Sequence, residues 1–360
     1  MNIYKLLKKL TETAGPSGFE EGVAAVIEEL WRPYVDSVAT DRVGNLTAVK
    51  EGTGTDPRPR LLLAAHMDEI GLMVKQVVEH NGSGFLRVTN VGGVDQRHLY
   101  GQMVQVHGRR TLTGILGSLP ASMLPPERRN KPFGFEELVV DIGLPYKESM
   151  ELVSIGDFVS FCQPLRKLLN KRVAGKALDN RASIAVVTIC LEYLSGRSHE
   201  WDVVAVATTQ EETSFLGAYA SGYRERPDAA VAIDVTHGKG PGVSDPDAFE
   251  LGAGPVIDLG PNVHPGMYQA LQDTAKALEM KVHTGPHARE SGTDAFSLQI
   301  AREGVPTGLA GVPLRYMHTM VESVDTADIE RCGRLLGEFI ARLDEKFLPN
   351  LSASLMDEDK

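Results

Sequence analysis

Apolar residues recur at helical spacing in several stretches of the chain and form short continuous runs in others. The helical spacing predicts helices over residues 3–13, 20–31, 180–194, 267–278 and 327–347. The continuous runs predict strands buried on both faces, and they fall at residues 61–65, 203–208, 229–235 and 306–310. Because strands and helices alternate, we expect an α/β fold with a mixed, largely parallel sheet flanked by helices.

Residues 71–162 have a different texture. Short β-type segments alternate there with Gly and Asn turns, and no long helical period appears. This spacing is typical of a small β-barrel or sandwich. A length of 360 residues accommodates two domains. We therefore expect an α/β domain made of residues 1–70 and 163–360, interrupted by an inserted β domain of residues 71–162.

Composition and charge narrow the possible partners. The chain carries 37 Lys and Arg against 48 Asp and Glu, a net charge of −11, which argues against a nucleic-acid partner. No apolar run is long enough for a membrane span, and residues 1–10 contain no signal-peptide core. Cys162, Cys190 and Cys332 are far apart and form no paired motif. We expect three buried thiols in a cytoplasmic protein.

Residues of types that can bind metals stand after the predicted strands or at the start of a predicted helix. Carboxyl ends of parallel strands meet at one edge of a sheet, so we expect these side chains to lie close together. They are His66, Asp179, Glu211, Glu212, Asp234 and His318. Each has an ordinary structural interpretation alone, such as a helix cap or a solvated strand end. Together they form the ligand set that a two-metal hydrolase requires.

The charges of this set favour bound cations. Four converging carboxylates would total −4, which two divalent ions would balance. Two unit charges about 4 Å apart interact by roughly 4 kcal/mol at an effective dielectric constant of about 20. Mixed imidazole and carboxylate ligands suit zinc or cobalt, with manganese possible, better than calcium.

Two local relationships add roles around these ligands. His66 and Asp68 are two positions apart at a strand end, so Asp68 is placed to accept a hydrogen bond from the imidazole and fix its tautomer. Glu211 and Glu212 are adjacent and should point in different directions. One of them can ligate a metal while the other handles a proton.

Several motifs resemble the tetrahedral (TET) dinuclear metalloaminopeptidases, a family that includes glutamyl, leucyl, lysyl and deblocking aminopeptidases, some of them labelled endoglucanase. The resemblance runs from about residue 6 to about residue 347, with the motifs in order. They are AHMDEIG at 65–71, ALDNR at 177–181, QEE at 210–212, SGTDA at 291–295 and RYMHT at 315–319.

The resemblance implies a role for each candidate residue. Asp179 would bridge two metals, His66 and Asp234 would complete one site, and Glu212 and His318 the other. Glu211 would be the general base, and Asp68 would orient His66. Many relatives have Asp where this chain has Asn180, but the bridging position is kept. The resemblance also implies a PDZ-like insert at the contacts of a dodecamer built from dimers.

These inferences lead to a working hypothesis. A hydroxide between two metals attacks the first peptide carbonyl of a peptide substrate, and Glu211 moves the proton. A two-metal amidohydrolase or deacylase acting on N-acyl amino acids, and a non-catalytic peptide-binding scaffold, remain as alternatives. His287, Arg289 and Glu290 are candidate substrate contacts or a solvated loop.

Overall fold

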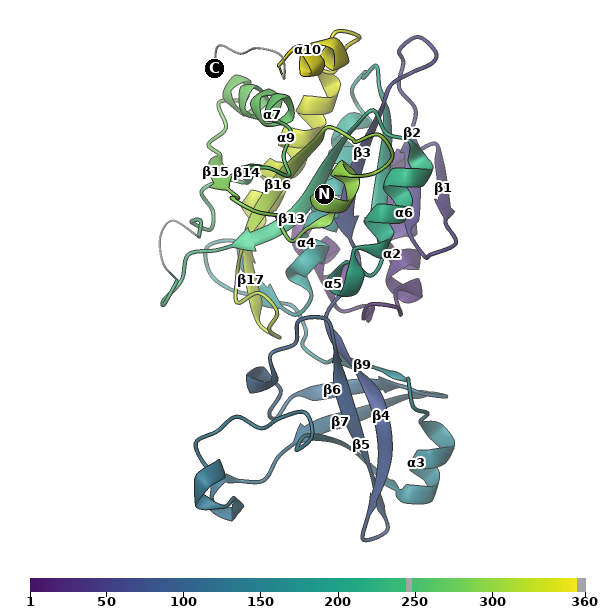
Figure 1. Ribbon diagram of the computed structural model, residues 1–360, viewed down its shortest axis with the longest axis vertical. Helices are drawn as coiled ribbons and strands as arrows, with labels where there is room; N and C mark the ends of the chain where they lie inside the picture. Colours follow the sequence, from purple (N-terminus) through teal and green to yellow (C-terminus); the bar gives the residue numbers. More distant parts are fainter. Residues whose placement is uncertain (244–247, 355–360) are drawn as a thin grey trace.

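The computed structural model describes residues 1–243 and 248–354 and has two parts, an open sheet flanked by helices and a closed barrel below it (Figure 1). The sheet contains 11 strands. They are β1 (Ser37–Thr40), β2 (Leu46–Lys50), β3 (Arg60–His66), β10 (Arg166–Lys167), β11 (Arg172–Gly175), β12 (Asp202–Thr208), β13 (Ala229–His237), β14 (Val256–Leu259), β15 (His283–Pro286), β16 (Thr307–Arg315) and β17 (Glu322–Asp325).

The parallel strands lie in the middle of this sheet. The strand order is β1-β2-β12-β3-β13-β16-β17-β11-β10, and the four strands from β12 to β16 pair in parallel. The register aligns Thr208 of β12 with His66 of β3, so both strands end at the same level. Antiparallel strands flank the parallel core on both sides. The expected α/β class with a mixed, largely parallel sheet is confirmed.

Helices cover both faces of the sheet because its central strands are apolar throughout. Along β3, Leu61 and Leu63 belong to one hydrophobic cluster, whereas Leu62 and Ala64 belong to another. The first cluster packs against α1, α2, α4, α7 and α9, and the second against α6 and α8. The helices are α1 (Ile3–Thr11), α2 (Glu21–Trp31), α4 (Leu178–Leu194), α5 (Glu211–Ser214), α6 (Leu216–Glu225), α7 (Pro265–Ala277), α8 (Asp294–Gln299), α9 (Thr326–Ala341) and α10 (Phe347–Ser354).

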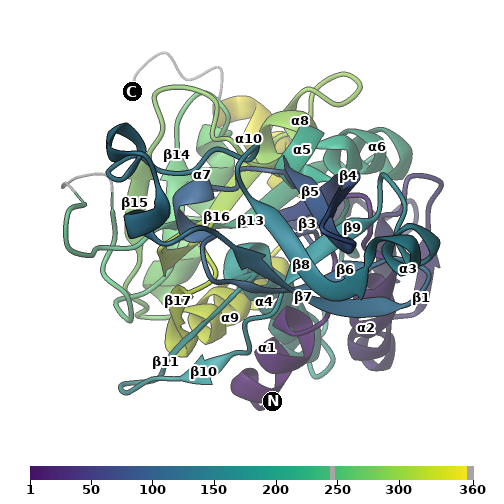
Figure 2. The same ribbon diagram turned by 90° about the horizontal axis from the view of Figure 1, so that it is seen from below.

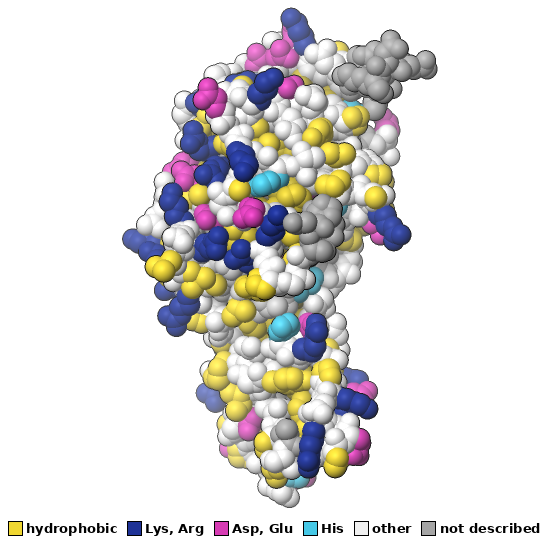
Figure 3. Space-filling view, turned by 90° about the vertical axis from the view of Figure 1, so that its left-hand side faces the viewer, with side chains coloured by type: hydrophobic (Ala, Val, Ile, Leu, Met, Phe, Trp, Pro, Cys, Tyr) yellow, Lys and Arg dark blue, Asp and Glu magenta, His cyan; other side chains and the backbone are white. Residues whose placement is uncertain are grey.

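The barrel has its own hydrophobic core, which includes Leu72, Leu86, Val104 and Val140. It forms the narrower lower part of the molecule (Figure 3) and is seen end-on from below in Figure 2. All its neighbouring strands pair antiparallel, in the order β4-β5-β8-β7-β6-β9. The strands are β4 (Gly71–His80), β5 (Ser83–Val91), β6 (Met103–His107), β7 (Thr111–Gly117), β8 (Val139–Pro145) and β9 (Phe158–Phe161), with helix α3 (Tyr146–Leu152) beside them.

One predicted helix is interrupted. The pattern of residues 327–347 predicts a single closing helix, but α9 ends at Ala341 and α10 begins at Phe347. Between them Asp344 accepts a hydrogen bond from the backbone of Lys346 at 2.9 Å, and its carbonyl accepts one from Trp201 at 3.2 Å. These contacts favour a turn that apolar spacing alone does not reveal.

In the part of the chain that the structure describes, none of the helices combines the length and the apolar character that a bilayer span requires.

Candidate metal centre

All five predicted ligands and Glu211 line one cavity of about 420 Å³. They reach it from the end of β3, from β13, from the starts of α4 and α5, and from the loop after β16. Asp68 does not line the cavity. The structure therefore brings together residues that are up to 252 positions apart, from His66 to His318.

Asp179 lies at the middle of the cluster. Its Oδ1 is 3.2 Å from Nε2 of His66, and its Oδ2 is 3.5 Å from Nε2 of His318. Asp234 stands on the His66 side, with its Oδ1 3.8 Å from Nε2 of His66. Glu212 stands on the His318 side, with its Oε2 3.4 Å from Nε2 of His318. The two oxygens of one carboxylate thus face two different imidazoles.

Glu211 and Glu212 point to different sides of the cluster, as their adjacency predicted. The Oε2 of Glu211 is 3.7 Å from Nε2 of His66, a distance similar to that of Asp234. Within residues 1–243 and 248–354, two groups have ligand atoms close enough to hold an ion, His66 with Glu211 and Asp234, and His66 with Asp179 and Glu212. Distance alone therefore does not separate a ligand role for Glu211 from a proton-transfer role.

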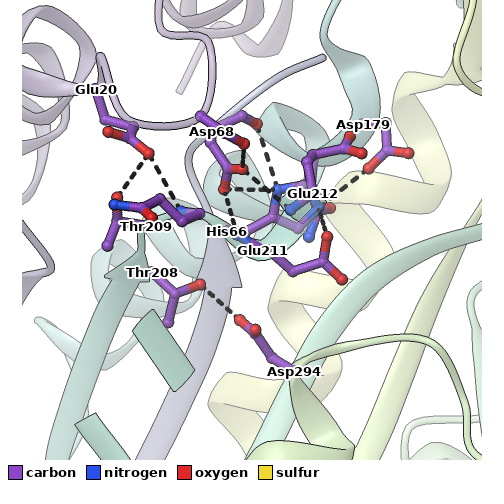
Figure 4. A network of polar contacts seen from close by, with 12 residues as sticks. Glu20, His66, Asp68, Asp179, Thr208, Thr209, Glu211, Glu212 and Asp294 are labelled. Atoms are coloured by element: carbon purple, nitrogen blue, oxygen red, sulfur yellow. Dashed lines mark hydrogen bonds and ion pairs between the residues drawn. The ribbon is translucent and has the colours of Figure 1, made fainter. Parts of the chain in front are cut away.

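Asp68 lies behind His66, away from the cavity. Its Oδ1 is 3.4 Å from Nδ1 of His66, and its backbone carbonyl is 3.3 Å from the same nitrogen. Its side chain also accepts hydrogen bonds from the backbone N–H groups of Glu211 at 3.0 Å and Glu212 at 3.1 Å, and from the hydroxyl of Ser17 (Figure 4). β3 ends at His66, so this contact comes from the turn after the strand rather than from the shared strand face that the sequence suggested.

The raised pKa values of the acidic groups reflect their burial and their closeness to one another. Burial raises the pKa of Glu211 to about 10, and the charge of Asp234 adds to the shift. Burial and then the charge of Asp179 raise the pKa of Glu212 and of Asp234 well above the ordinary range. These carboxyl groups stay protonated unless a bound cation replaces the protons.

The pKa values of His66 and Asp68, which contact each other, shift in opposite directions. Burial alone would lower the pKa of His66, but Glu211, Asp179 and Asp68 outweigh it and raise that pKa well above the ordinary value. Burial alone would raise the pKa of Asp68, but hydrogen bonds from His66 and Ser17 lower it. Asp68 is therefore charged and can hold the Nδ1 proton of His66.

The donor set fits divalent cations. Three carboxylates and two imidazoles converge, and most of their side chains are buried without an Arg or Lys in the cluster among the described residues. Imidazole nitrogen and carboxylate oxygen are ligands that zinc, cobalt and manganese accept. Asn180, the departure from many relatives, does not line the cavity; its amide donates to the carbonyl of Ile233 at 3.0 Å.

The sequence did not identify several carboxylates that surround the centre. Glu322 accepts hydrogen bonds from the backbone of Asp179 and His318. Asp294 accepts one from the hydroxyl of Thr208 at 2.5 Å, and burial raises the pKa of Asp294 to about 6. Glu20 accepts one from the hydroxyl of Thr209 at 2.6 Å (Figure 4). Only the SGTDA motif pointed to any of them, because the others have no distinctive spacing.

A second polar pair lines the same cavity. Asp258 of β14 is buried, and its Oδ1 is 3.0 Å from Nε2 of His287, which follows β15. The hydrogen bond to Asp258 raises the pKa of His287. The structure thus brings His287 to the cavity, whereas Arg289 and Glu290 are exposed and do not line it.

The barrel also reaches the cavity. Gly92 and Gly93 follow β5, and Gly93 lines the cavity beside His318. A Cβ atom at Gly92 would lie 3.3 Å from Cβ of Glu212. The loop from the barrel therefore approaches the side chains of Glu212 and His318.

Comparisons with known proteins agree with this architecture. The lysyl aminopeptidase of Pyrococcus furiosus is 33% identical over 348 residues, which cover 94% of this chain and 97% of that protein. A TET aminopeptidase from the marine sediment archaeon Thaumarchaeota archaeon SCGC AB-539-E09 superposes with a TM-score of 0.90 at 30% identity, covering 97% of this chain and 98% of that one. The TET1 peptidase of Pyrococcus horikoshii, described as able to assemble into a tetrahedron or a large octahedral shell, superposes with a TM-score of 0.82 at 30% identity, covering 95% and 100%.

The fold and these relatives define a hydrolase that acts on peptides. Residues 44–335 match the family described as M42 glutamyl aminopeptidase. The chain belongs to this family, as the motifs predicted, and its activity is that of an aminopeptidase.

Proposed function

We propose that the chain is a dinuclear-metal aminopeptidase that releases N-terminal residues from peptides. Asp179 would hold both ions, with His66 and Asp234 at one and Glu212 and His318 at the other. The observation that carries this proposal is the placement of the two Asp179 oxygens, one facing His66 at 3.2 Å and the other facing His318 at 3.5 Å. A single-ion site would not need ligands on both sides of one carboxylate.

The remaining residues supply proton transfer and orientation. When bound, two divalent ions would supply a lowered pKa for a coordinated water and polarisation of the substrate carbonyl. Glu211 accepts the proton of the attacking water and passes it to the leaving amine. Glu211 is assigned this role on the family resemblance, and Asp234, at a similar distance from Nε2 of His66, is assigned the ligand role. Asp68 keeps the proton of His66 on Nδ1, which leaves Nε2 free to bind metal.

The metal, the assembly and the compartment belong to the same proposal. Zinc or cobalt suits the ligand set best, and manganese is acceptable. The substrate is a peptide with a free N-terminus, and nucleic acid is not a partner. Residues 1–70 and 163–360 form the catalytic domain, and residues 71–162 mediate a homo-oligomer, a dodecamer built from dimers, in the cytoplasm. The assembly of the similar TET1 peptidase and the three free thiols support these points.

A direct test compares metal content with substrate class. The purified protein should contain two divalent ions per chain and should hydrolyse aminoacyl-anilides, and a chelator should abolish the activity until zinc or cobalt is restored. N-acyl amino acids should remain intact, which would exclude a deacylase. Hydrolysis of acylated substrates alone, or full activity without metal, would refute the proposal. A protein that binds metal but turns over no substrate would instead be a scaffold.

A further inference from the structure

Glu322 is a buried carboxylate that contacts the backbone of two candidate ligands. Its side chain is 2% exposed. Its Oε2 accepts a hydrogen bond from the N–H of Asp179 at 2.9 Å, and its Oε1 accepts one from the N–H of His318 at 3.0 Å. One side chain therefore joins two segments that are 139 positions apart in the chain, at the points where they enter the metal centre.

The element that carries Glu322 is held firmly. Glu322 begins β17 and pairs with Gly175 of β11, and β17 also pairs with the end of β16. The carboxylate thus stands on a strand at the sheet, whereas the ligands that it contacts stand on a turn and at the irregular start of a helix. A rigid group that binds two irregular segments fixes the distance between them.

The backbone at His318 needs such support. His318 has φ of 60° and Tyr316 has φ of 62°, and both are non-glycine residues in the left-handed region. Non-glycine residues in this region are strained and persist only where surrounding contacts hold them. The hydrogen bond from the N–H of His318 to Glu322 is a contact of this kind, and the position of the imidazole depends on it.

The two ligands that Glu322 contacts meet in one half of the centre. Asp179, His318 and Glu212 would hold one ion, whereas the other ion would share Asp179 and take His66 and Asp234 as its own ligands. We propose that Glu322 is a positioning residue that sets the spacing between Asp179 and His318 and thereby determines how tightly that half retains its ion. This inference rests on the proposed dinuclear site.

The test is the substitution Glu322→Gln, which keeps the shape of the side chain but turns one acceptor into a donor. One of the two N–H groups then faces an NH₂ group and loses its partner. Loss of a group that orients ligands weakens metal binding by about 10- to 100-fold. We expect a weakening of this size for the ion held by Asp179, Glu212 and His318, and a clearly smaller weakening for the other ion, which shares only Asp179 of the two contacted ligands.

The measurement uses the full chain, titrated with zinc against a competing chelator. Anomalous scattering from crystals soaked at limiting zinc then assigns the weakened site. Equal loss of both ions, or wild-type affinity for both, would overturn the proposal. If the wild-type protein itself binds fewer than two ions, the proposed function fails instead, so the two failures are distinguishable.

Asp328 provides a matched control. It is fully buried on α9, accepts hydrogen bonds from the N–H groups of Gly252 at 2.6 Å and Gly254 at 2.9 Å, and does not line the cavity. The substitution Asp328→Asn therefore removes the same kind of acceptor elsewhere and should leave both zinc affinities unchanged. Should Glu322→Gln not fold, Glu322→Asp withdraws the carboxylate by one methylene and must show the same selective weakening, since an unselective effect would also overturn the proposal.

Discussion

Gly93 of the barrel lies directly against the imidazole of His318 in the α/β part of the molecule. A Cβ atom at Gly93 would lie 2.6 Å from Nδ1 and 2.8 Å from Cε1 of that ring, closer than real Cβ atoms come to other atoms. The observed position of the His318 ring therefore requires a glycine at position 93.

The substitution Gly93→Ala should displace the His318 ring from Asp179 and Glu212. We expect zinc affinity at that half of the centre to fall by about 10-fold or more, because even the loss of groups that only orient ligands weakens sites by this amount. Zinc titration against a chelator measures the change. Gly117→Ala in β7 is the control, because no atom lies within 4 Å of the position its Cβ would take. An unchanged affinity in Gly93→Ala would show that the ring can shift without cost.

Glu211→Gln should separate proton transfer from metal binding. The amide keeps the size of the side chain but cannot accept the proton, so kcat should fall by about 10²- to 10⁴-fold, the usual contribution of a general base. Metal content, measured by mass spectrometry of the purified protein, should remain at the wild-type level. Glu212→Gln should do the opposite and lose metal first. Loss of an ion in Glu211→Gln would mean that Glu211 is itself a ligand.

Removal of the metals should make stability depend strongly on pH. Burial raises the pKa of Glu211 to about 10 and that of Asp294 to about 6, against ordinary values of 4.5 and 3.8. These two carboxyls therefore bind more protons in the folded metal-free protein than in the unfolded chain from about pH 4 to about pH 10, and their contribution to the free energy of unfolding falls as pH rises through this window. Asp68, whose pKa is lowered, acts in the opposite direction only in more acidic solution. Four histidines whose pKa burial lowers oppose the effect near and below their ordinary pKa of 6.5, and they are His107, His199, His264 and His283.

Urea unfolding at about pH 7 and about pH 8.5, above the ordinary pKa of histidine, measures this effect with and without chelator. The metal-free protein should be less stable at the higher pH. The metal-loaded protein should lose much less stability, because metal binding replaces the protons and strengthens as they are released. A metal-free protein that becomes more stable between these two values would contradict the assignment of the cluster.

The three cysteines should differ in reactivity. Cys190 and Cys332 are fully buried, burial raises both of their pKa values, and that of Cys332 reaches about 12. Cys162 is partly exposed. Partial burial raises its pKa, and the positive charge of Lys176 counteracts part of this shift. At pH 8 a disulfide reagent should label at most one thiol per native chain and three in urea, and Cys162→Ser should abolish the native reaction. Labelling of two thiols in the native protein would refute the burial of the pair.

The apolar pattern predicted the sheet and the insert well because both depend on local regularities. Continuous runs of Val, Ala and Leu stay buried wherever the strand is placed, and the alternation of residues 71–162 requires a β structure of some kind. The same pattern failed after Ala341, where the backbone follows hydrogen bonds of Asp344 rather than the spacing of apolar residues.

The candidate ligands could be named from the sequence because they are chemically distinctive and follow strands whose ends meet at one edge. The amino-acid order alone therefore determined the fold class and the insert, and it predicted the candidate set His66, Asp179, Glu211, Glu212, Asp234 and His318. Only the tertiary structure decided which oxygen of Asp179 faces which imidazole, that Glu322 contacts two ligand segments, and that Gly93 lies against His318. These relationships are distances between residues far apart in the chain, and such distances depend on how the whole sheet and barrel pack.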